Sequence, residues 1–272
     1  MRLLDAVVGF SVGASSFFSA TVLSYRYMTA FCDVWDYPLF DLDFKVSVVL
    51  PTFNEEANVL SCLGSLARQN IRVAYPEMFE VLLVDSGSED RTVELATPYV
   101  DRVINAPRGK LTARDLGVKE ARGDVIVAVD ADTFYPCNFI NLLLRHFRDW
   151  SVVATGGPRL VAEPNLIGVG YVWKAFKDYL TGGRLPGSSS AFRREAYFKV
   201  GGFNLNINQF NVNEMCREEE HAFAERLKKL GKVIFDLRAV CFTSPRRWLC
   251  YSPEAGEEVK RFCMAVARKE RF

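Results

Sequence analysis

The sequence lacks the patterns that would assign this protein to several common classes. The net charge is only +1, so no basic excess argues for a nucleic-acid partner. None of the 7 cysteines belongs to a CxxC pair, so neither a zinc site nor a disulfide framework is expected. We expect reduced thiols, as in a cytosolic catalytic domain. Internal repeats and low-complexity tracts are also missing. The 272 residues, 49% of them hydrophobic, suffice for one large domain or two small ones.

Residues 6–25 contain no charged side chain. Their number is close to the roughly 20 residues that a helix needs to cross a bilayer. Gly9 and Gly13 have the GxxxG spacing that lets membrane helices approach closely. A membrane-anchoring helix is therefore the preferred interpretation. A cleaved signal peptide is disfavoured by Asp5 and by the lack of an A-x-A site, and a soluble core or interfacial helix stays open.

From residue 45 onward, short apolar runs alternate with segments of helical period. The pattern predicts strands at 45–51, 79–85, 102–106, 126–136 and 151–156, and helices at 55–70, 89–100, 110–123, 138–149 and 216–231. Such alternation predicts an α/β fold with a mostly parallel sheet flanked by helices. Ligands of these sheets bind beyond the carboxyl ends of the strands.

Polar residues gather where three of these strands end, in the segments PTFNEE, DSGSED and DAD. The last segment contains Asp130 and Asp132, which would point the same way in an extended chain. Burying two unpaired carboxylates would cost several kcal/mol, and a divalent cation removes that penalty. The pair therefore suggests Mg²⁺ or Mn²⁺ bridging the protein to a diphosphate. Alternatively, one Asp caps the next helix and the other is solvated.

The segments VSVVLPTFNEE, LLVDSGSEDRT, RGKLTARDLGVKEARGDVIVAVDADT, AFRREAYFKVGGFN and EEEHAFAERLKKLGK follow one another in a characteristic order. This order resembles family 2 glycosyltransferases of the GT-A fold. The resemblance implies a Rossmann-like GT-A domain at 45–245. It also implies metal-dependent, inverting transfer of a sugar from a nucleotide-diphospho-sugar. Residues 1–44 would then form the apolar helix and an acidic-aromatic linker (33–44), and 246–272 a basic amphipathic helix.

The resemblance also implies roles for individual residues. The nucleoside would be held by Pro51, Thr52, Asn54, Glu55 and Asp85. The donor phosphates would meet Arg108, Lys110 and Arg114, for which a solvated helix face is the alternative. Asp132 would be the direct metal ligand, with Asp130 beside it at the metal and the donor. Ser189 lies in a Gly/Ser-rich segment, 182–195, expected near the donor sugar and acceptor unless this is a plain surface loop. Arg246 and Arg247 would close over the diphosphate or contact a membrane surface.

The family usually has a Glu-Asp pair five residues before an Arg-Leu pair, and Glu219 and Glu220 stand at those positions. Glu220 would then be the general base in place of the usual Asp. Three consecutive glutamates leave the register open among Glu218, Glu219 and Glu220. The alternative is a charged first helical turn that complements the helix dipole.

Several functions remain open at the level of the sequence. The acceptor is a hydroxyl, for which Glu220 would take the proton, or a polyprenyl phosphate, which needs no base. A nucleotidyltransferase would need a Gly-rich, Lys-containing loop after the first strand, and PTFNEEAN has none. A non-catalytic membrane scaffold with the same fold is the other rival. We expect a membrane-associated protein whose catalytic domain faces the cytosol, with Mn²⁺ or Mg²⁺ as cofactor.

Overall fold

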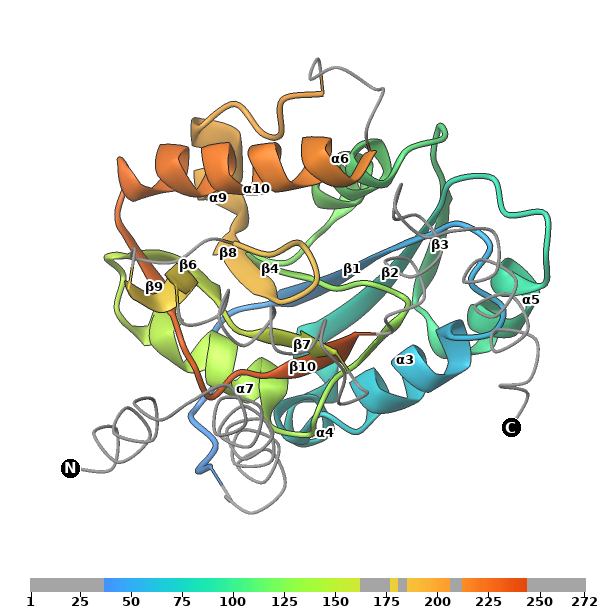
Figure 1. Ribbon diagram of the computed structural model, residues 1–272. Helices are drawn as coiled ribbons and strands as arrows, with labels where there is room; N and C mark the ends of the chain where they lie inside the picture. Colours follow the sequence, from blue (N-terminus) through green and yellow to red (C-terminus); the bar gives the residue numbers. More distant parts are fainter. Residues whose placement is uncertain (1–36, 162–176, 181–184, 206–211, 244–272) are drawn as a thin grey trace, which may run out of the picture.

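The computed structural model describes residues 37–161, 177–180, 185–205 and 212–243 (Figure 1). Its main sheet has 7 strands in the order β3-β2-β1-β4-β8-β6-β9. The strands are β1 (Val46–Thr52), β2 (Phe79–Asp85), β3 (Arg102–Asn105), β4 (Val125–Ala128), β6 (Val152–Gly156), β8 (Ser190–Arg193) and β9 (Lys232–Phe235). A second sheet has 3 strands in the order β5-β10-β7, namely β5 (Thr133–Phe134), β10 (Cys241–Thr243) and β7 (Arg159–Val161).

Within the main sheet, β8 alone runs against its neighbours. It pairs antiparallel with β4 and with β6, whereas the β1–β2, β2–β3, β1–β4 and β6–β9 pairs are parallel. The mostly parallel α/β sheet is therefore confirmed. The interpretation of 182–195 as one loop is wrong at Ser190–Arg193. Ala191 and Phe192 are buried there, and burial favours a strand between β4 and β6.

Helices cover both faces of the main sheet (Figure 1). The helices are α3 (Val59–Ala67), α4 (Asn70–Ala74), α5 (Thr92–Ala96), α6 (Lys110–Glu120), α7 (Phe139–Leu144), α9 (Arg194–Lys199) and α10 (Val212–Lys228). Short 3₁₀ turns lie at Pro76–Met78, Thr97–Tyr99 and Arg145–Arg148. Along β1, Val48 and Leu50 pack with the α3 and α7 side, while Val49 packs with α6, α9 and α10. This alternation shows why strands buried on both faces are apolar throughout.

Several expected helices are shorter than their periodicity suggested; the one expected at 138–149, for example, is divided into α7 and the 3₁₀ turn Arg145–Arg148. The helix expected at 55–70 begins only at Val59, because the Glu55 amide donates to Thr92 Oγ1 (2.7 Å) and residues 55–58 belong to the loop after β1. The helix expected at 89–100 is reduced to α5 and a 3₁₀ turn. The polar starts of both segments therefore form the carboxyl edge of the sheet.

The expected domain borders are only partly within the described residues. Phe40 and Leu42 pack in the core, so this part of the expected linker belongs to the folded domain. Segment 6–25 and the basic segment 246–272 lie outside the described residues. Among the residues that the structure describes, no helix is both long and apolar enough to span a bilayer.

Helix α6 lies unusually close to the sheet at Gly117. A Cβ atom at this position would lie 2.4 Å from Val49 Cγ1 and 2.9 Å from Val84 Cγ2. Both valines are buried strand residues with little room to move. Gly117 therefore allows the close approach that sets the height of α6 above β1 and β2.

We expect Gly117→Ala to lower the free energy of unfolding by about 1–3 kcal/mol, because the added methyl overpacks the core. Gly64→Ala in α3 is the matched control, since a Cβ there meets no atom within 4 Å. It should raise the stability by roughly 0.5–1 kcal/mol through the higher helix propensity of alanine. Urea unfolding of both variants measures the difference, and equal effects of the two substitutions would contradict the close-packing argument.

Candidate functional site

The carboxyl ends of β1 and β2 are joined by side chains. Thr52 and Asp85 are direct partners in the parallel register. Thr52 Oγ1 donates to Asp85 Oδ1 (3.0 Å), and Asp85 Oδ2 accepts from the amides of Gly87 (3.0 Å) and Ser88 (2.8 Å). Asp85 is almost fully buried. Both of its oxygens therefore order the loop after β2, and any contact with a nucleoside would add to these bonds.

Asn54 ties the loop after β1 to the same region. Its backbone has φ 51°, a conformation that asparagine tolerates better than most residues. Its amide donates to Ser88 Oγ (2.9 Å) and its Oδ1 accepts from the Glu89 amide (2.9 Å). Glu55 beside it is buried and accepts from Asn58 Nδ2 (2.9 Å). Pro51 is a buried residue of β1 itself.

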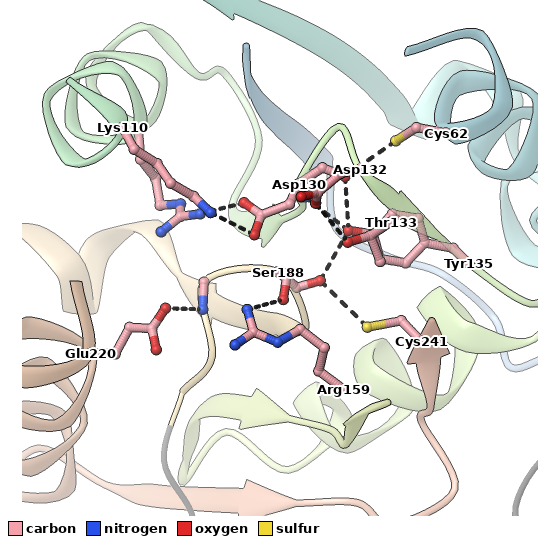
Figure 2. Close-up of polar contacts among 12 residues, drawn as sticks. Cys62, Lys110, Asp130, Asp132, Thr133, Tyr135, Arg159, Ser188, Glu220 and Cys241 are labelled. Atoms are coloured by element: carbon pink, nitrogen blue, oxygen red, sulfur yellow. Dashed lines mark hydrogen bonds and ion pairs between the residues drawn. The ribbon is translucent and has the colours of Figure 1, made fainter. Parts of the chain in front are cut away.

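Two cations of α6 meet the carboxylate of Asp130, and Figure 2 labels one of them, Lys110. Lys110 Nζ lies 2.7 Å from Oδ2, and Arg114 Nη2 lies 2.8 Å from Oδ1. The side chain of Arg114 is only 2% exposed, so the interpretation as a solvated helix face is wrong for this residue. Arg108 is exposed, with its guanidinium 4.4 Å from the centre of the Phe53 ring.

Opposing effects act on the pKa of Asp130. Burial favours the neutral acid and raises the pKa, whereas the charges of Lys110 and Arg114 lower it. The cations win, and the pKa of Asp130 lies well below its usual range. The group is therefore an ionised carboxylate held inside the protein by two protein cations.

The Asp130–Asp132 segment is not the extended strand that its sequence suggested. β4 ends at Ala128, and Ala131 and Asp132 lie in a turn before β5. The expected strand 126–136 is therefore wrong at residues 129–132, where the Asp130 amide donates to the Tyr135 hydroxyl (2.8 Å) instead of a neighbouring strand, and Thr133–Phe134 belong to the separate strand β5. Asp132 is half-buried, and its Oδ1 accepts from Thr133 Oγ1 (3.3 Å). The two aspartates thus have different partners.

Three carboxylates from two segments, the loop after β1 and the turn after β4, act on the thiol of Cys62. Burial raises its pKa well above the usual value, and the charges of Asp132, Asp130 and Glu55 raise it further. All three carboxylates lie in segments that follow the carboxyl ends of β1 and β4. Among the described residues, no group of three or more His, Cys, Asp or Glu side chains is placed to hold a metal ion. The half-buried Asp132 still fits an ion such as Mg²⁺, which takes one or two carboxylates and completes its shell with water and phosphate oxygens.

The two described glutamate side chains at the start of the 219–226 segment have separate environments. Glu219 is fully buried, and its Oε1 accepts from Arg226 Nη2 (2.6 Å) and from the Asn204 amide (2.8 Å). Glu220 is half-buried, and its Oε1 accepts from the Gly187 amide (2.7 Å). Of these two, Glu220 faces the loop that reaches the Asp130 cluster.

That loop, residues 185–189, lies between the cations of α6 and the glutamate of α10 (Figure 2). A Cβ at Gly187 would lie 2.0 Å from Arg114 Nη1, so only glycine leaves room for the guanidinium. Ser188 Oγ accepts from Arg159 Nη1 (3.2 Å). Ser189 is buried, and its hydroxyl donates to the Gly157 carbonyl (2.7 Å). Arg246 and Arg247 lie outside the described residues.

Sequence reasoning missed three residues of this region: Tyr135, Arg159 and Asp178. The charge of Arg159 helps to lower the pKa of Asp130, so this cation of β7 belongs to the same cluster. Burial and the negative charge of Glu220 raise the pKa of Asp178 to about 6. None of these three residues belongs to a sequence motif with a characteristic spacing, so the sequence alone did not single them out.

The geometry defines a class of protein: a Rossmann-like α/β protein with charged side chains at the carboxyl edge of its sheet. Residues 47–198 match the sequence model of glycosyl transferase family 2, so the chain belongs to that family.

Two curated relatives show how far the sequence similarity extends. The dolichol-phosphate mannosyltransferase of Pyrococcus furiosus is 35% identical over 120 residues, which are 41% of this chain and 32% of that protein. The hyaluronan synthase of Streptococcus pyogenes is 33% identical over 128 residues, which are 42% of this chain and 29% of that protein. The matched part of the chain therefore spans less than half the length of either relative.

Solved structures share the fold at low sequence identity. A mannosyltransferase from Pyrobaculum calidifontis, in complex with GDP-Man and Mn²⁺, aligns with a TM-score of 0.61 at 20% identity, covering 97% of this chain and 72% of the other. TarS residues 1–349 of S. aureus align with a TM-score of 0.56 at 18% identity, covering 82% of this chain and 65% of the other. These likenesses establish the GT-A fold.

We expect Asp130→Asn to lower the free energy of unfolding at pH 7 by about 3–5 kcal/mol, because it leaves the Arg114 charge buried without its partner. The folded-state pKa of Asp130 lies well below its unfolded value of about 3.9, so its contribution is complete above that value and is lost as the pH falls from there through the folded-state pKa. The difference in unfolding free energy between the two proteins should therefore be largest at pH 7 and only partly reduced at pH 3, where Asp130 of the folded protein is still ionised.

Asp149→Asn is the matched control. Its carboxylate is half exposed and pairs with the exposed Lys232 at 3.0 Å, so its loss should matter far less at pH 7. If Asp130→Asn were as mild as this control, the ion pairs of Asp130 would contribute little to the fold.

Proposed function

We propose that this protein transfers a sugar from a nucleotide-diphospho-sugar to an acceptor at the carboxyl edge of its sheet. The observation that carries the proposal is the buried Asp130 carboxylate, paired with Lys110 and Arg114 and facing the Glu220 loop. Cations fixed in this way can meet a diphosphate without a new cost of ordering them. Membership of glycosyl transferase family 2 supports the same reaction.

The donor is proposed to lie across the ends of β1, β2 and β4. Thr52, Asn54, Glu55 and Asp85 are gathered there by the loop bonds between the first two strands, which supports a nucleoside at this position. The side chain of Lys110 is 29% exposed and can reach from Asp130 to a donor phosphate. Arg114 is buried and would act on the phosphates at a distance, as a charge fixed by its pairing with Asp130.

A divalent ion is proposed to be held by Asp132, with Asp130 behind it. The carboxylate oxygens fit Mn²⁺ or Mg²⁺. When bound, such an ion neutralises charge on a leaving diphosphate. The Mn²⁺ and GDP-Man in the Pyrobaculum calidifontis mannosyltransferase support this assignment.

Glu220 is proposed as the general base for a hydroxyl acceptor. Its carboxylate, held by the Gly187 amide, would accept the proton while the acceptor oxygen attacks the anomeric carbon from the face opposite the diphosphate. The configuration then inverts in a single displacement. The buried Glu219 is proposed to hold α10 in place through Arg226.

A lipid-linked phosphate is the alternative acceptor, since an anion needs no base. The dolichol-phosphate mannosyltransferase relative supports it, whereas the hyaluronan synthase relative supports a growing glycan. Either acceptor is compatible with a membrane-associated protein whose catalytic domain is in the cytosol. The anchor at 6–25 and the diphosphate contacts of Arg246 and Arg247 remain predictions.

The donor site is tested by thermal-shift measurements with UDP, GDP, CDP and dTDP sugars, with and without Mn²⁺. A ligand at 100 times its Kd should stabilise the native state by about 2.7 kcal/mol and raise the melting temperature. We expect one donor series to act, and to act more strongly with Mn²⁺. Asp132→Ala should abolish the Mn²⁺-dependent part of the shift.

Asp124→Ala is the control for Asp132→Ala. Asp124 accepts from the Lys45 amide (2.9 Å) at the opposite end of β4, so this variant should keep the full shift. A wild-type protein that responds to no donor, with or without Mn²⁺, would sink the transferase proposal. An unchanged shift in Asp132→Ala would favour a scaffold that binds without the metal.

Glu220→Gln distinguishes the two acceptor classes. For a hydroxyl acceptor, we expect kcat to fall by about 10²–10⁴-fold with little change in donor binding, because glutamine cannot take the proton. For a phosphate acceptor, kcat should stay within a few-fold of the wild type. Glu225→Gln on the same helix is the control, since Glu225 is half exposed and pairs with Lys228. A loss of donor binding in Glu220→Gln would contradict the base assignment.

A further inference from the structure

Tyr135 is a buried residue whose hydroxyl joins two separate parts of the site (Figure 2). It accepts a hydrogen bond from the Asp130 amide (2.8 Å) and donates one to the Ser188 carbonyl (3.0 Å). The first partner belongs to the turn that carries Asp130 and Asp132. The second belongs to the loop that contacts Glu220. The hydroxyl oxygen of Tyr135 therefore connects the turn of Asp130 and Asp132 to the loop that contacts Glu220.

Two thiols support the same pair of backbone segments. Cys62 Sγ of α3 donates to the Asp130 carbonyl (3.4 Å), and Cys241 Sγ of β10 donates to the Ser188 carbonyl (3.8 Å). Thiols are weak donors, so the phenol provides the stronger of these bonds. Burial raises the pKa of Tyr135 well above its usual value, so the hydroxyl keeps its proton and can donate and accept at once.

The bridge that the Tyr135 hydroxyl forms between the Asp130 amide and the Ser188 carbonyl joins segments that carry the proposed site residues. Asp130 is held on its other side by Lys110 and Arg114. Ser188 follows Gly187, whose amide donates to Glu220. A movement of either segment would change the distance between the carboxylates of the turn and the carboxylate of α10. Errors of about 1 Å in such a distance can cost about 10²-fold in rate.

We propose that Tyr135 is a positioning residue that fixes the spacing between the Asp130–Asp132 turn and the loop holding Glu220. This inference rests on the proposed function, in which the turn serves the donor and Glu220 serves the acceptor. Tyr135 itself lies behind both segments and acts only through their backbones.

Tyr135→Phe tests the proposal with the loss of a single oxygen. The ring should stay in place, because it packs against Phe139 at a centroid distance of 4.9 Å. We expect kcat to fall by about 10-fold or more and the Mn²⁺ concentration for half-maximal nucleotide binding to rise. We also expect faster hydrogen–deuterium exchange in the peptides covering Asp130 and Gly187, measured without any ligand.

Ser47→Ala is the matched control, because Ser47 is also a buried hydroxyl that bridges two groups. It accepts from the Gly123 amide (2.7 Å) and donates to Glu80 Oε1 (2.5 Å) near the amino end of β1. This variant should lower the melting temperature while leaving the Mn²⁺ dependence and the exchange at Asp130 unchanged. A purely structural role of Tyr135 predicts the same result for Tyr135→Phe.

The outcomes separate the two proposals. If the wild type transfers sugar, and Tyr135→Phe folds with unchanged exchange, kcat and Mn²⁺ dependence, the positioning role is overturned and the proposed function stands. If the wild type binds no donor, the proposed function fails, and unchanged exchange in the variant would overturn the bridge separately. Should the variant not fold, the wild-type Asp130 amide decides: it should exchange as slowly as that of Val127 in β4, and rapid exchange would overturn the bridge.

Discussion

The carboxylate of Asp130 is a negative charge inside the protein, and the cations around it compensate that charge. An isolated buried carboxylate would take up a proton, yet this one stays ionised because Lys110 and Arg114 contact its two oxygens. The charge of Arg159 also lowers the pKa of Asp130, so three cations act on this carboxylate. In the proposed function these cations meet a diphosphate, and their positions are set before any ligand arrives. The ion pairs therefore link the stability of the fold to the charge that the proposed donor needs.

Small residues create the space in which this charge cluster forms. Gly117 lets α6 approach Val49 and Val84, which brings the cations of α6 to the end of β4. Gly187 leaves room for the guanidinium of Arg114, and the same residue donates its amide to Glu220. Side chains at these glycines would separate charges that must stay in contact. The ion pairs of the site thus depend on the close approach of backbone segments at these two glycines.

Hydrophobic periodicity in the sequence predicted the positions of the central strands. The strand expected at 79–85 matches β2, and the first strand is displaced by only one residue, because alternate residues of buried strands face two apolar layers. The motifs also drew attention to Asp130 and Glu220, whose roles stay predictions. The turn at Asp132, the strand β8 and the place of Arg159 depend instead on contacts between distant residues. The bond from the Asp130 amide to a tyrosine hydroxyl, for example, has no counterpart in hydropathy or spacing.

Glu219 and Glu220 are adjacent in the sequence but have different environments in the structure. The geometry of the helix therefore distinguishes glutamates that the sequence alone could not. Successive residues of an α-helix point about 100° apart, so adjacent side chains cannot share one environment. Glu219 enters the core and binds Arg226 and the Asn204 amide, which fixes the rotation of α10 about its axis. Once that rotation is fixed, the next carboxylate is directed to Gly187. A partly buried ion pair with no proposed part in the reaction therefore helps to set where the proposed base lies.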